Sequence, residues 1–491
     1  MSSYALKTSE KTFDNSFWSI LKEAVRGSGR DFTKGSIGLA IFLLAVPMIL
    51  EMMMESLFAV CDIFFVAKLG PDSIAVVGIT ESMMAIIYAV AFGLAIGATA
   101  TVARRIGEKD IEGAAKTATH VIYLGLILSV VLSAIGITFA PYFLKFLGAE
   151  PQVIAEGVTF TRIMLGGNAV VVFIFLLNAI FRGAGDAAVA MRVLWLANGL
   201  NIVLAPCFIF GSDIFAVVGI NAPDWLIANW IFPKLGVTGA AVGTTLGRGI
   251  GVLFAAWNLF RPAGRITIRR VNWAFDYHLL WKLVRLSSTA VLQLIIATAS
   301  WSALMPIVAG FGSEAIAGYV IGLRVIIFAL LPALGLSNAA ATLVGQNLGA
   351  GKPERAERSV WQASFFNAAF YGLVGLVFIF FAGQIIGIFS TEPTVFAYGT
   401  NCLRIVAYGF LFYGFGMVVE TAFNGAGDTW TPTYLNLFIF WLFEIPLAYL
   451  LAYYFDLGPH GVFWAITIAF SVLAVVSALI FRRGRWKEKV V

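Results

Sequence analysis

The sequence predicts an all-α polytopic membrane protein, with twelve transmembrane helices in two parallel-repeat bundles of six. Of its 491 residues, 60% are hydrophobic and 12% are charged, whereas soluble proteins carry about 25% charged residues. The mean hydropathy is +0.89. The apolar runs have the roughly 20 residues or more that a membrane-crossing helix needs, unlike the short alternating segments of a membrane barrel. Finally, many features recur at a constant offset of 242 residues.

Twelve apolar runs follow one another along the chain. They cover residues 36–67, 73–103, 117–147, 153–181, 187–211, 236–260, 286–310, 315–346, 358–388, 395–423, 430–455 and 459–481.

These runs divide the chain into five parts. The parts are a polar N-terminal segment (1–34), a first bundle (35–260), a basic linker (261–285), a second bundle (286–482) and a tail (483–491). In the first part, Phe13, Phe17, Leu21 and Val25 recur at near-helical spacing. This spacing indicates either a short interfacial helix or a disordered segment.

Lysines and arginines concentrate in alternate connections, among which we count Arg182 between the fourth and fifth spans. Since such residues favour the cytoplasmic side of a membrane, both termini are expected there. The net charge of +6 therefore reflects topology, and we expect no binding of nucleic acid. No signal peptide is apparent.

The repeat separates shared features from unique ones. Gly93 and Gly335 coincide, as do Gly107 and Gly349, and FRGAGD at 181–186 coincides with FNGAGD at 423–428. Six spans per half give both halves the same orientation, so the repeats are parallel. Shared residues are expected to be scaffold, and residues present in one half are the better site candidates.

The unique residues are mostly acids. Glu51 coincides with Gln293, Glu55 with Ala297, Asp62 with Leu304, and Glu420 with Asn178; Glu444 is likewise unmatched.

Glu51, Glu55 and Asp62 all lie in the first span. At 100° per residue, their spacing keeps them within roughly 40° on one helix face. A charge in hydrocarbon costs at least about 2.5 kcal/mol, so this face must contact protein, water or a bound cation. The alternative is that these acids only hydrogen-bond neighbouring helices.

Other polar and apolar groups have two interpretations each. Asn198 and Asn201 in the fifth span either bridge helices or form a polar site facing the first span. Met54, among neighbouring methionines, lines an adaptable apolar pocket or faces lipid. In the sixth span, glycines recur every fourth residue from Gly239 to Gly251, which predicts close helix packing, and Arg248 beside them is expected to pair with a carboxylate or a carbonyl.

Two classes of catalytic or metal site find little support. GAGD matches the GxGD pattern of intramembrane aspartyl proteases, but it occurs in both halves and lacks a convincing partner aspartate. Glycines for a tight corner, with the aspartate capping the next helix, explain it better. Three scattered cysteines and three histidines predict no metal centre. We therefore expect no enzyme and no cofactor.

The chain resembles the multidrug and toxic compound extrusion (MATE) transporters over essentially all twelve spans. The residues that carry the resemblance are VCDIFFVAKLG at 60–70, GLRVIIFALLPALGLSNAAATLVGQNLGAGKPERA at 322–356, NIVLAPCFIFG at 201–211 and the paired GAGD corners. It is nearer the DNA-damage-inducible-type prokaryotic branch, because Gln293 replaces an acid in the seventh span.

The resemblance implies two bundles facing each other across a cleft, in a bacterial inner-membrane antiporter that exports cationic, amphipathic compounds in exchange for H⁺ or Na⁺. By position, Asp62 matches the cation-coupling aspartate and Asn201 an asparagine of the same site. Ala205 departs from the pattern, which usually has an aspartate there. Glu51 or Glu55 is the candidate to compensate.

Further candidates for the cleft or the substrate site are Asn198, Gln293, Glu420, Glu444 and Met54. We expect a monomer embedded in the bilayer. The nearest alternative function is a flippase for lipid-linked saccharides, which would be expected to carry more cationic residues in the cleft.

Overall fold

The computed structural model describes residues 16–221, 223–262 and 264–489, and in this part the helical fold predicted from the sequence is confirmed. Eleven of its helices are long and apolar enough to cross a membrane, or twelve if the bent pair α14 and α15 is one span. The predicted position of Phe13 on an interfacial helix lies outside the described residues.

The first bundle contains seven helices, because its fourth span is interrupted at Gly167. They are α2 (Ile37–Ala67), α3 (Pro71–Gly107), α4 (Ile111–Phe146), α5 (Pro151–Gly166), α6 (Asn168–Ala184), α7 (Ala187–Phe210) and α10 (Val237–Phe260).

The second bundle repeats this order, but its tenth and eleventh spans are less regular. Its elements are α11 (Tyr277–Ala309), α12 (Ser313–Gly349), α13 (Pro353–Gly387), α14 (Pro393–Ala407), α15 (Phe410–Gly425), α16 (Trp430–Asn436), η3 (Leu437–Glu444), α17 (Ile445–Tyr449), η4 (Leu450–Tyr454) and α18 (Pro459–Arg482). The stretches η3 and η4 are wound as π-helix.

Short elements lie outside the bundles. They are α1 (Phe17–Arg26), η1 (Gly211–Asp213), α8 (Ile214–Val217), α9 (Asp224–Ala228), η2 (Arg270–Trp273) and η5 (Arg485–Glu488).

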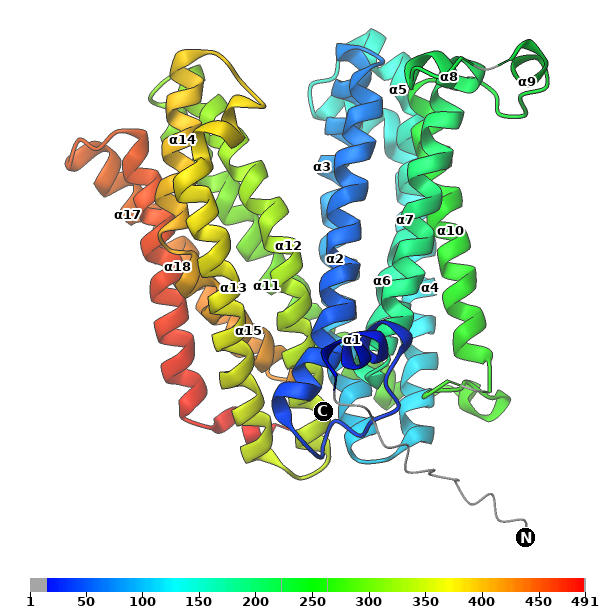
Figure 1. The fold of residues 1–491 in the computed structure, drawn as a ribbon, viewed down its shortest axis with the longest axis vertical. Coiled ribbons are helices and arrows are strands. Elements are labelled where there is room, and N and C mark those ends of the chain that lie inside the picture. Colours follow the sequence, from blue (N-terminus) through cyan, green and yellow to red (C-terminus); the bar gives the residue numbers. More distant parts are fainter. Residues whose placement is uncertain (1–15, 222, 263, 490–491) are drawn as a thin grey trace.

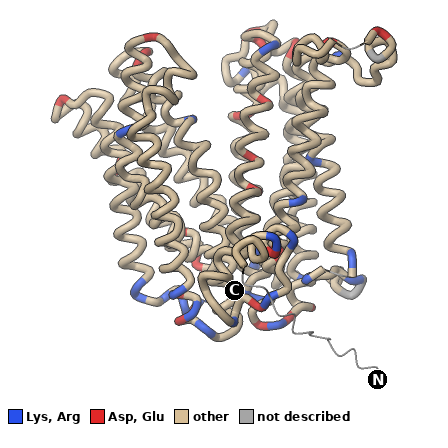
Figure 2. The backbone as a smooth tube through the Cα atoms, viewed as in Figure 1, with Lys and Arg blue, Asp and Glu red and all other residues tan. Residues whose placement is uncertain are grey.

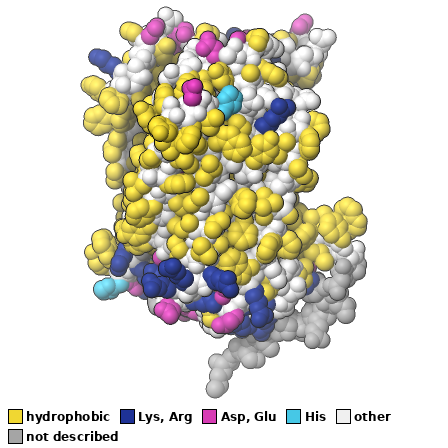
Figure 3. Space-filling view, turned by 90° about the vertical axis from the view of Figure 1, so that its left-hand side faces the viewer, with side chains coloured by type: hydrophobic (Ala, Val, Ile, Leu, Met, Phe, Trp, Pro, Cys, Tyr) yellow, Lys and Arg dark blue, Asp and Glu magenta, His cyan; other side chains and the backbone are white. Residues whose placement is uncertain are grey.

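The two bundles meet at one end of the molecule and diverge toward the other (Figure 1). We call the first the terminus end, because α1 and η5 lie there; most lysines and arginines also gather there (Figure 2). Between the two ends, hydrophobic side chains cover the face of the second bundle shown in Figure 3. An apolar band between charged ends is the surface expected of a protein that spans a bilayer.

Repeated glycines form the contact between the bundles. A Cβ on Gly107 would overlap the carbonyl of Gln346, and a Cβ on Gly349 would overlap that of Arg104. These two contacts are equivalent under the 242-residue repeat. The glycines recur because α3 and α12 cross with their backbones in direct contact, which no larger residue permits.

A second pair of reciprocal contacts lies further along the same helices. A Cβ on Gly93 would overlap Val291 of α11, and a Cβ on Gly335 would overlap the backbone of α2 at Met48 and Ile49. The expectation that repeated glycines serve the scaffold agrees with this geometry.

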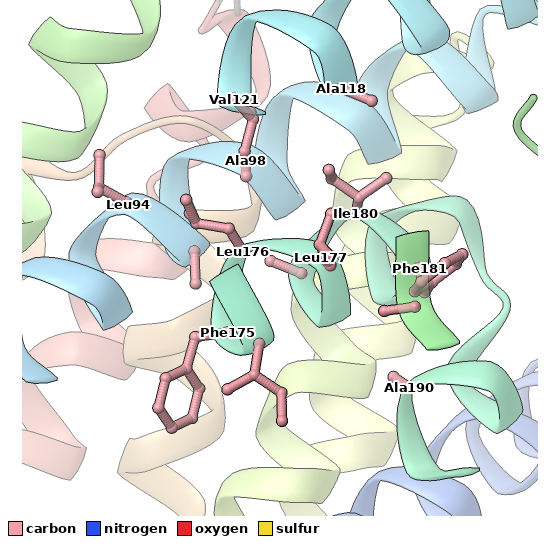
Figure 4. Close-up of a cluster of buried hydrophobic side chains, with 14 of the residues drawn as sticks. Leu94, Ala98, Ala118, Val121, Phe175, Leu176, Leu177, Ile180, Phe181 and Ala190 are labelled. Carbon is pink, nitrogen blue, oxygen red and sulfur yellow. The ribbon is translucent and has the colours of Figure 1, made fainter. Parts of the chain in front are cut away.

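Within the first bundle, α6 is the central helix. Figure 4 shows Phe175, Leu176 and Ile180 of α6 among side chains of α3, α4 and α7, including Leu94 and Val121. This packing fixes the face of α6 that turns toward α2.

The glycines of α10 pack closely as predicted, and the structure shows that their partner is α7. A Cβ on Gly243 would overlap Ala205, and one on Gly247 would overlap the backbone at Ala197 and Asn201. The close approach of the two helices brings the α10 side chains next to Gly247 into the interior of the bundle.

The GAGD corners turn as predicted but do not cap as predicted. Gly185 and Gly427 have φ of +80° and +85°, a conformation that favours glycine. However, the Asp186 side chain makes no cap hydrogen bond to α7. Asp428 instead accepts a hydrogen bond from the Thr431 hydroxyl.

The segment 27–35, which we call the N-terminal strap, joins α1 to α2 and contacts both bundles. Lys352 Nζ donates to the Thr33 carbonyl at 2.9 Å, and Arg355 donates to the carbonyls of Gly35 and Lys34, each at 2.9 Å. Both donors belong to the start of α13. The strap thereby ties the second bundle to the first at the terminus end.

Candidate functional site

Glu51 on α2 is fully buried and paired. Its Oε1 lies 2.9 Å from Nη1 of Arg182 and accepts a hydrogen bond of 3.0 Å from Asn178 Nδ2, both on α6. The side chains of Arg182 and Glu51 are only 5% and 1% exposed. The charge of Glu51 is therefore neutralised inside the protein. Our assignment of Arg182 to a connection between spans was wrong, because the α6 helix continues to Ala184.

Glu55, one turn further along α2, is also paired. Arg248 Nη2 of α10 lies 2.8 Å from its Oε1, and Asn198 Nδ2 of α7 donates to its Oε2 at 2.7 Å. The same guanidinium donates to the hydroxyl of Tyr88 at 3.2 Å and lies 5.0 Å from the ring centre of Phe58. Arg248 thus pairs with a carboxylate, one of the two partners predicted for it.

Asp62 lies two turns beyond Glu55 and has no such partner. Its Oδ1 is buried and receives no hydrogen bond from any described residue. Its charged neighbours are Glu81 of α3 and Arg248, but the guanidinium of Arg248 is already bound to Glu55. Asp62 is thus the one member of the acidic stripe that forms no ion pair in the described part of the chain.

Asn201 and Ala205 lie on α7. The amide of Asn201 donates to the Thr244 hydroxyl at 2.8 Å, so it links α7 to α10. Ala205 is buried against Gly243, in the space where the related pattern has a carboxylate. Met54 of α2 packs toward Gly199 of α7.

The second bundle also holds two acids inside the fold, Glu420 on α15, which is half-buried, and Glu444 at the end of η3, which is buried. Gln293 Nε2 of α11 donates to Glu420 Oε1 at 2.9 Å. Glu444 is 3% exposed. Within the described residues, neither acid forms an ion pair with lysine or arginine. Tyr413 of α15 lies within electrostatic reach of both.

A small cavity of about 40 Å³ lies where the bundles separate. Thr99 and Arg182 line it from the first bundle, and Asn338, Thr421 and Asn424 from the second. Beyond this level, α2 changes from half of its residues buried before Glu51 to most of them exposed or half-buried after it. The predicted site acids thus begin where α2 leaves the contact between the bundles.

Three partners in this network were not assigned a role from the sequence: Asn178, Tyr88 and Thr244. The sequence contained only an indirect signal for these three partners. A buried carboxylate requires a cation or donors, so the acids on α2 already called for partners on the other helices.

Comparison with known proteins gives consistent results over the whole transmembrane region. The MatE family profile matches residues 47–207 and again 290–450, which are the two halves of the repeat. The chain is 24% identical to the probable multidrug resistance protein NorM of Thermotoga maritima, over 91% of this chain and 93% of the relative.

Two further relatives carry different functional names. The multidrug export protein MepA of Staphylococcus aureus is 22% identical over 91% of this chain and 94% of its own. The FAD transporter of Shewanella oneidensis is 26% identical over 91% and 95%.

Among solved structures, the fold is similar to a transporter of the MOP superfamily from Pyrococcus furiosus, with a TM-score of 0.85 and 27% identity over 94% of this chain and 99% of that chain. A multidrug resistance MATE transporter in an outward-facing conformation gives the same TM-score, identity and coverage.

Proposed function

Because the chain belongs to the MATE family of multi-pass membrane transporters, we propose that it exports cationic, amphipathic small molecules in exchange for protons. The names of NorM and MepA support efflux of small molecules. The substrate charge and the coupling ion are argued below from the site.

The single observation that carries the proposal is the carboxyl of Asp62, which forms no ion pair with any described residue and has Glu81 as its acidic neighbour. Glu51 and Glu55 already have arginine partners, and Ala205 supplies no oxygen ligand. One unpaired carboxyl suffices to bind and release a proton, whereas Na⁺ favours several hard oxygen ligands. Neither glutamate is therefore a good substitute for the missing aspartate, and we favour H⁺ over Na⁺ as the coupling ion. No organic cofactor is required.

The position of Asp62 on α2 suggests how protonation alters the bundle contact. Further toward its N-terminus, next to Pro47, the same helix packs on Gly335 of α12 through the backbone of Met48 and Ile49. Protonation removes a buried charge and changes the preferred packing of α2. A ligand shifts a conformational equilibrium only through such differential interaction with the two states. A cationic substrate would compete with the proton for the same negative charge.

The terminus end is proposed to face the cytoplasm across the inner membrane, because its lysines and arginines favour that side. In this orientation the bundles are closed toward the cytoplasm and diverge toward the outside. The similarity to an outward-facing relative supports the same assignment.

An anionic substrate is the main alternative, since one relative is an FAD transporter. Arg182 and Arg248 reach the interior of the first bundle near the site, and both are bound to carboxylates. Arg324 of α12 lies within electrostatic reach of Glu81, so it also faces an acid. This engagement favours cations over anions and over lipid-linked saccharides with anionic head groups.

The test is efflux of a fluorescent cationic dye from proteoliposomes, driven separately by a pH gradient and by a Na⁺ gradient. We expect flux with the pH gradient alone, reduced to background in Asp62→Asn. The matched control is Asp72→Asn, which removes an exposed carboxyl from the same bundle and should leave flux unchanged.

Other outcomes identify the alternatives. Flux driven by Na⁺ would contradict the coupling ion proposed here. Full flux in Asp62→Asn would contradict the role of Asp62. Transport of FAD without transport of the dye would contradict the substrate class.

A further inference from the structure

A cavity of about 320 Å³ lies at the terminus end of the first bundle, away from the site described above. Three separate segments enclose it: the start of the N-terminal strap, the corner between α6 and α7, and the linker after α10. Its volume is near the lower limit of known ligand pockets, about 300 Å³. It therefore suits a small polar group better than a whole drug-sized molecule.

Arg265 of the linker holds these segments together. Its guanidinium donates to the carbonyls of Ser28, Arg30 and Ala184. It also lies 5.0 Å from the ring centre of Phe32. Because its donors are engaged by the protein, Arg265 builds the wall of the cavity.

Three other arginines line the same cavity: Arg26, Arg192 and Arg261. Within the described residues, none of them forms an ion pair with a carboxylate. Arg192 donates through Nε to the Ala188 carbonyl at 3.0 Å. Its Nη2 extends toward Gly27, the first residue of the strap.

A single acid, Asp186, is found in the lining. Burial raises the pKa of this carboxyl, while Arg265 and Arg192 nearby act in the opposite direction. One carboxyl cannot balance four guanidinium groups, so the cavity has an excess of positive charge. An anion is the complementary occupant.

The surroundings place this cavity at the level of a membrane surface. On α1, Phe17 and Trp18 are 59% and 73% exposed. At the end of α10, Trp257 is exposed, and the Arg261 guanidinium lies 5.1 Å from its ring centre. Exposed aromatic side chains beside arginines are typical of the interface between hydrocarbon and water. Lipid phosphates lie at this level.

We propose that the cavity binds the phosphate group of an anionic phospholipid among Arg26, Arg192 and Arg261. Basic pockets at the cytoplasmic ends of transmembrane helices recognise lipid head groups in this way. Guanidinium groups bind phosphate through paired, charge-assisted hydrogen bonds. The acyl chains would extend along the apolar surface beside α1 and α10.

The test is native mass spectrometry of the purified full chain, released from detergent micelles that contain either phosphatidylglycerol or phosphatidylcholine. We expect one phosphatidylglycerol molecule to be retained preferentially. The double variant Arg192→Gln/Arg261→Gln should weaken this binding at least about tenfold, the loss of roughly 1.4 kcal/mol.

The matched control is Arg162→Gln/Arg404→Gln, which removes two exposed arginines from repeat-related positions elsewhere. It should bind phosphatidylglycerol like the wild type. Thermal unfolding in phosphatidylcholine micelles checks that each variant is folded, and the altered arginines are exposed. Inorganic phosphate, added as a competitor at millimolar concentration, distinguishes a soluble anion from a lipid.

Three outcomes would overturn the proposal. Equal retention of the two lipids would remove the charge selectivity. Unchanged binding in a folded Arg192→Gln/Arg261→Gln variant would place the lipid elsewhere. Displacement of the lipid by millimolar inorganic phosphate would make the cavity a site for soluble anions.

Discussion

The two bundles share one fold but differ at the repeat-related positions of Glu51 and Glu420, where the first bundle holds an ion pair and the second does not. In the first bundle, Glu51 and Glu55 are each held by a buried arginine. In the second bundle, Glu420 and Glu444 have no cationic partner among the described residues. A buried ion pair is retained as a unit, whereas an isolated buried carboxyl favours its neutral form. The repeat therefore preserves the scaffold, whereas pairing of the acids with arginine is confined to Glu51 and Glu55. Asp62 of the first bundle is unpaired like the two acids of the second.

The repeat positions show how the difference arises. Glu51 accepts from Asn178 in the first bundle, and the equivalent residues, Gln293 and Glu420, bond with acid and amide exchanged. Arg182 corresponds to Asn424 in the second bundle. The exchange keeps one hydrogen bond between equivalent helices but removes the counter-charge.

An amide and an acid are also exchanged between α7 and the eleventh span, at Asn198 and Glu444. Trp195 and Trp441 each donate their indole N–H to a carbonyl of the first helix of their bundle, at 2.9 Å. Three residues later come Asn198 and Glu444 respectively. At the helix position where α10 has Arg248, α18 has Phe470, whose ring lies 4.1 Å from that of Tyr413.

The largest loss of stability is expected when Arg248 is removed from its ion pair with Glu55. Arg248→Met leaves Glu55 buried without its charge partner, which should destabilise the protein by about 3–5 kcal/mol. Thermal unfolding in detergent measures this loss. The double variant Arg248→Met/Glu55→Gln should recover much of it, and failure to recover would show that Arg248 acts through packing alone.

A matched pair of acid removals tests the comparison directly. Glu51→Gln leaves Arg182 buried and unpaired and should cost about 3 kcal/mol. Glu420→Gln removes an uncompensated charge and should change stability by no more than about 1 kcal/mol. The two melting temperatures are compared in one buffer, and equal losses would mean that the bundles do not differ as described.

An arginine introduced at position 424 should give Glu420 the kind of ion-pair partner that Glu51 has in the first bundle. In Asn424→Arg, the new guanidinium can reach the Glu420 side of α15, one turn away. A double-mutant cycle with Glu420→Gln should then give a coupling energy of about 1–2 kcal/mol. A coupling near zero would show that the cavity beside Asn424 hydrates the new charge instead.

The smallest effect is expected for an ion pair at the surface. Asp276 caps α11 and bonds Lys116 at 2.8 Å, and the Lys116 hydrogen bond lowers the pKa of this carboxyl to about 2. A lowered pKa stabilises the folded state above the unfolded value of about 3.9, and this stabilisation is lost as pH falls toward 2.

The variant Asp276→Asn should therefore melt slightly below the wild type at pH 7. The gap should close between about pH 4 and pH 2. A gap that persists unchanged at the acid limit would assign the effect to the helix cap instead of the charge.

The fold and the acidic stripe could be predicted because both depend on local patterns. Span length, lysine and arginine bias and the constant repeat offset are read directly from the chain, and helical periodicity places Glu51, Glu55 and Asp62 on one face. Which acid is free depends on distant residues. Arg182 lies 131 positions from Glu51, and Arg248 lies 193 positions from Glu55.

The conformation of the eleventh span was also beyond sequence patterns. Its π-helical winding in η3 and η4 contrasts with the regular α7 helix, although the two spans have similar mean hydropathy. Periodicity at 3.6 residues does not distinguish the two windings. The place of Glu444 at the end of η3 therefore required the structure.

The N-terminal strap has a consequence for the speed of transport. The strap is bonded on one side to Lys352 and Arg355 and on the other to Arg265, so opening of the terminus end would break one of these two sets of hydrogen bonds. Such bonds contribute to the height of the activation barrier as well as to the resting equilibrium. These hydrogen bonds would therefore slow each transport cycle. Because the strap accepts them through backbone carbonyls, substitutions of strap side chains should leave the bonds largely intact.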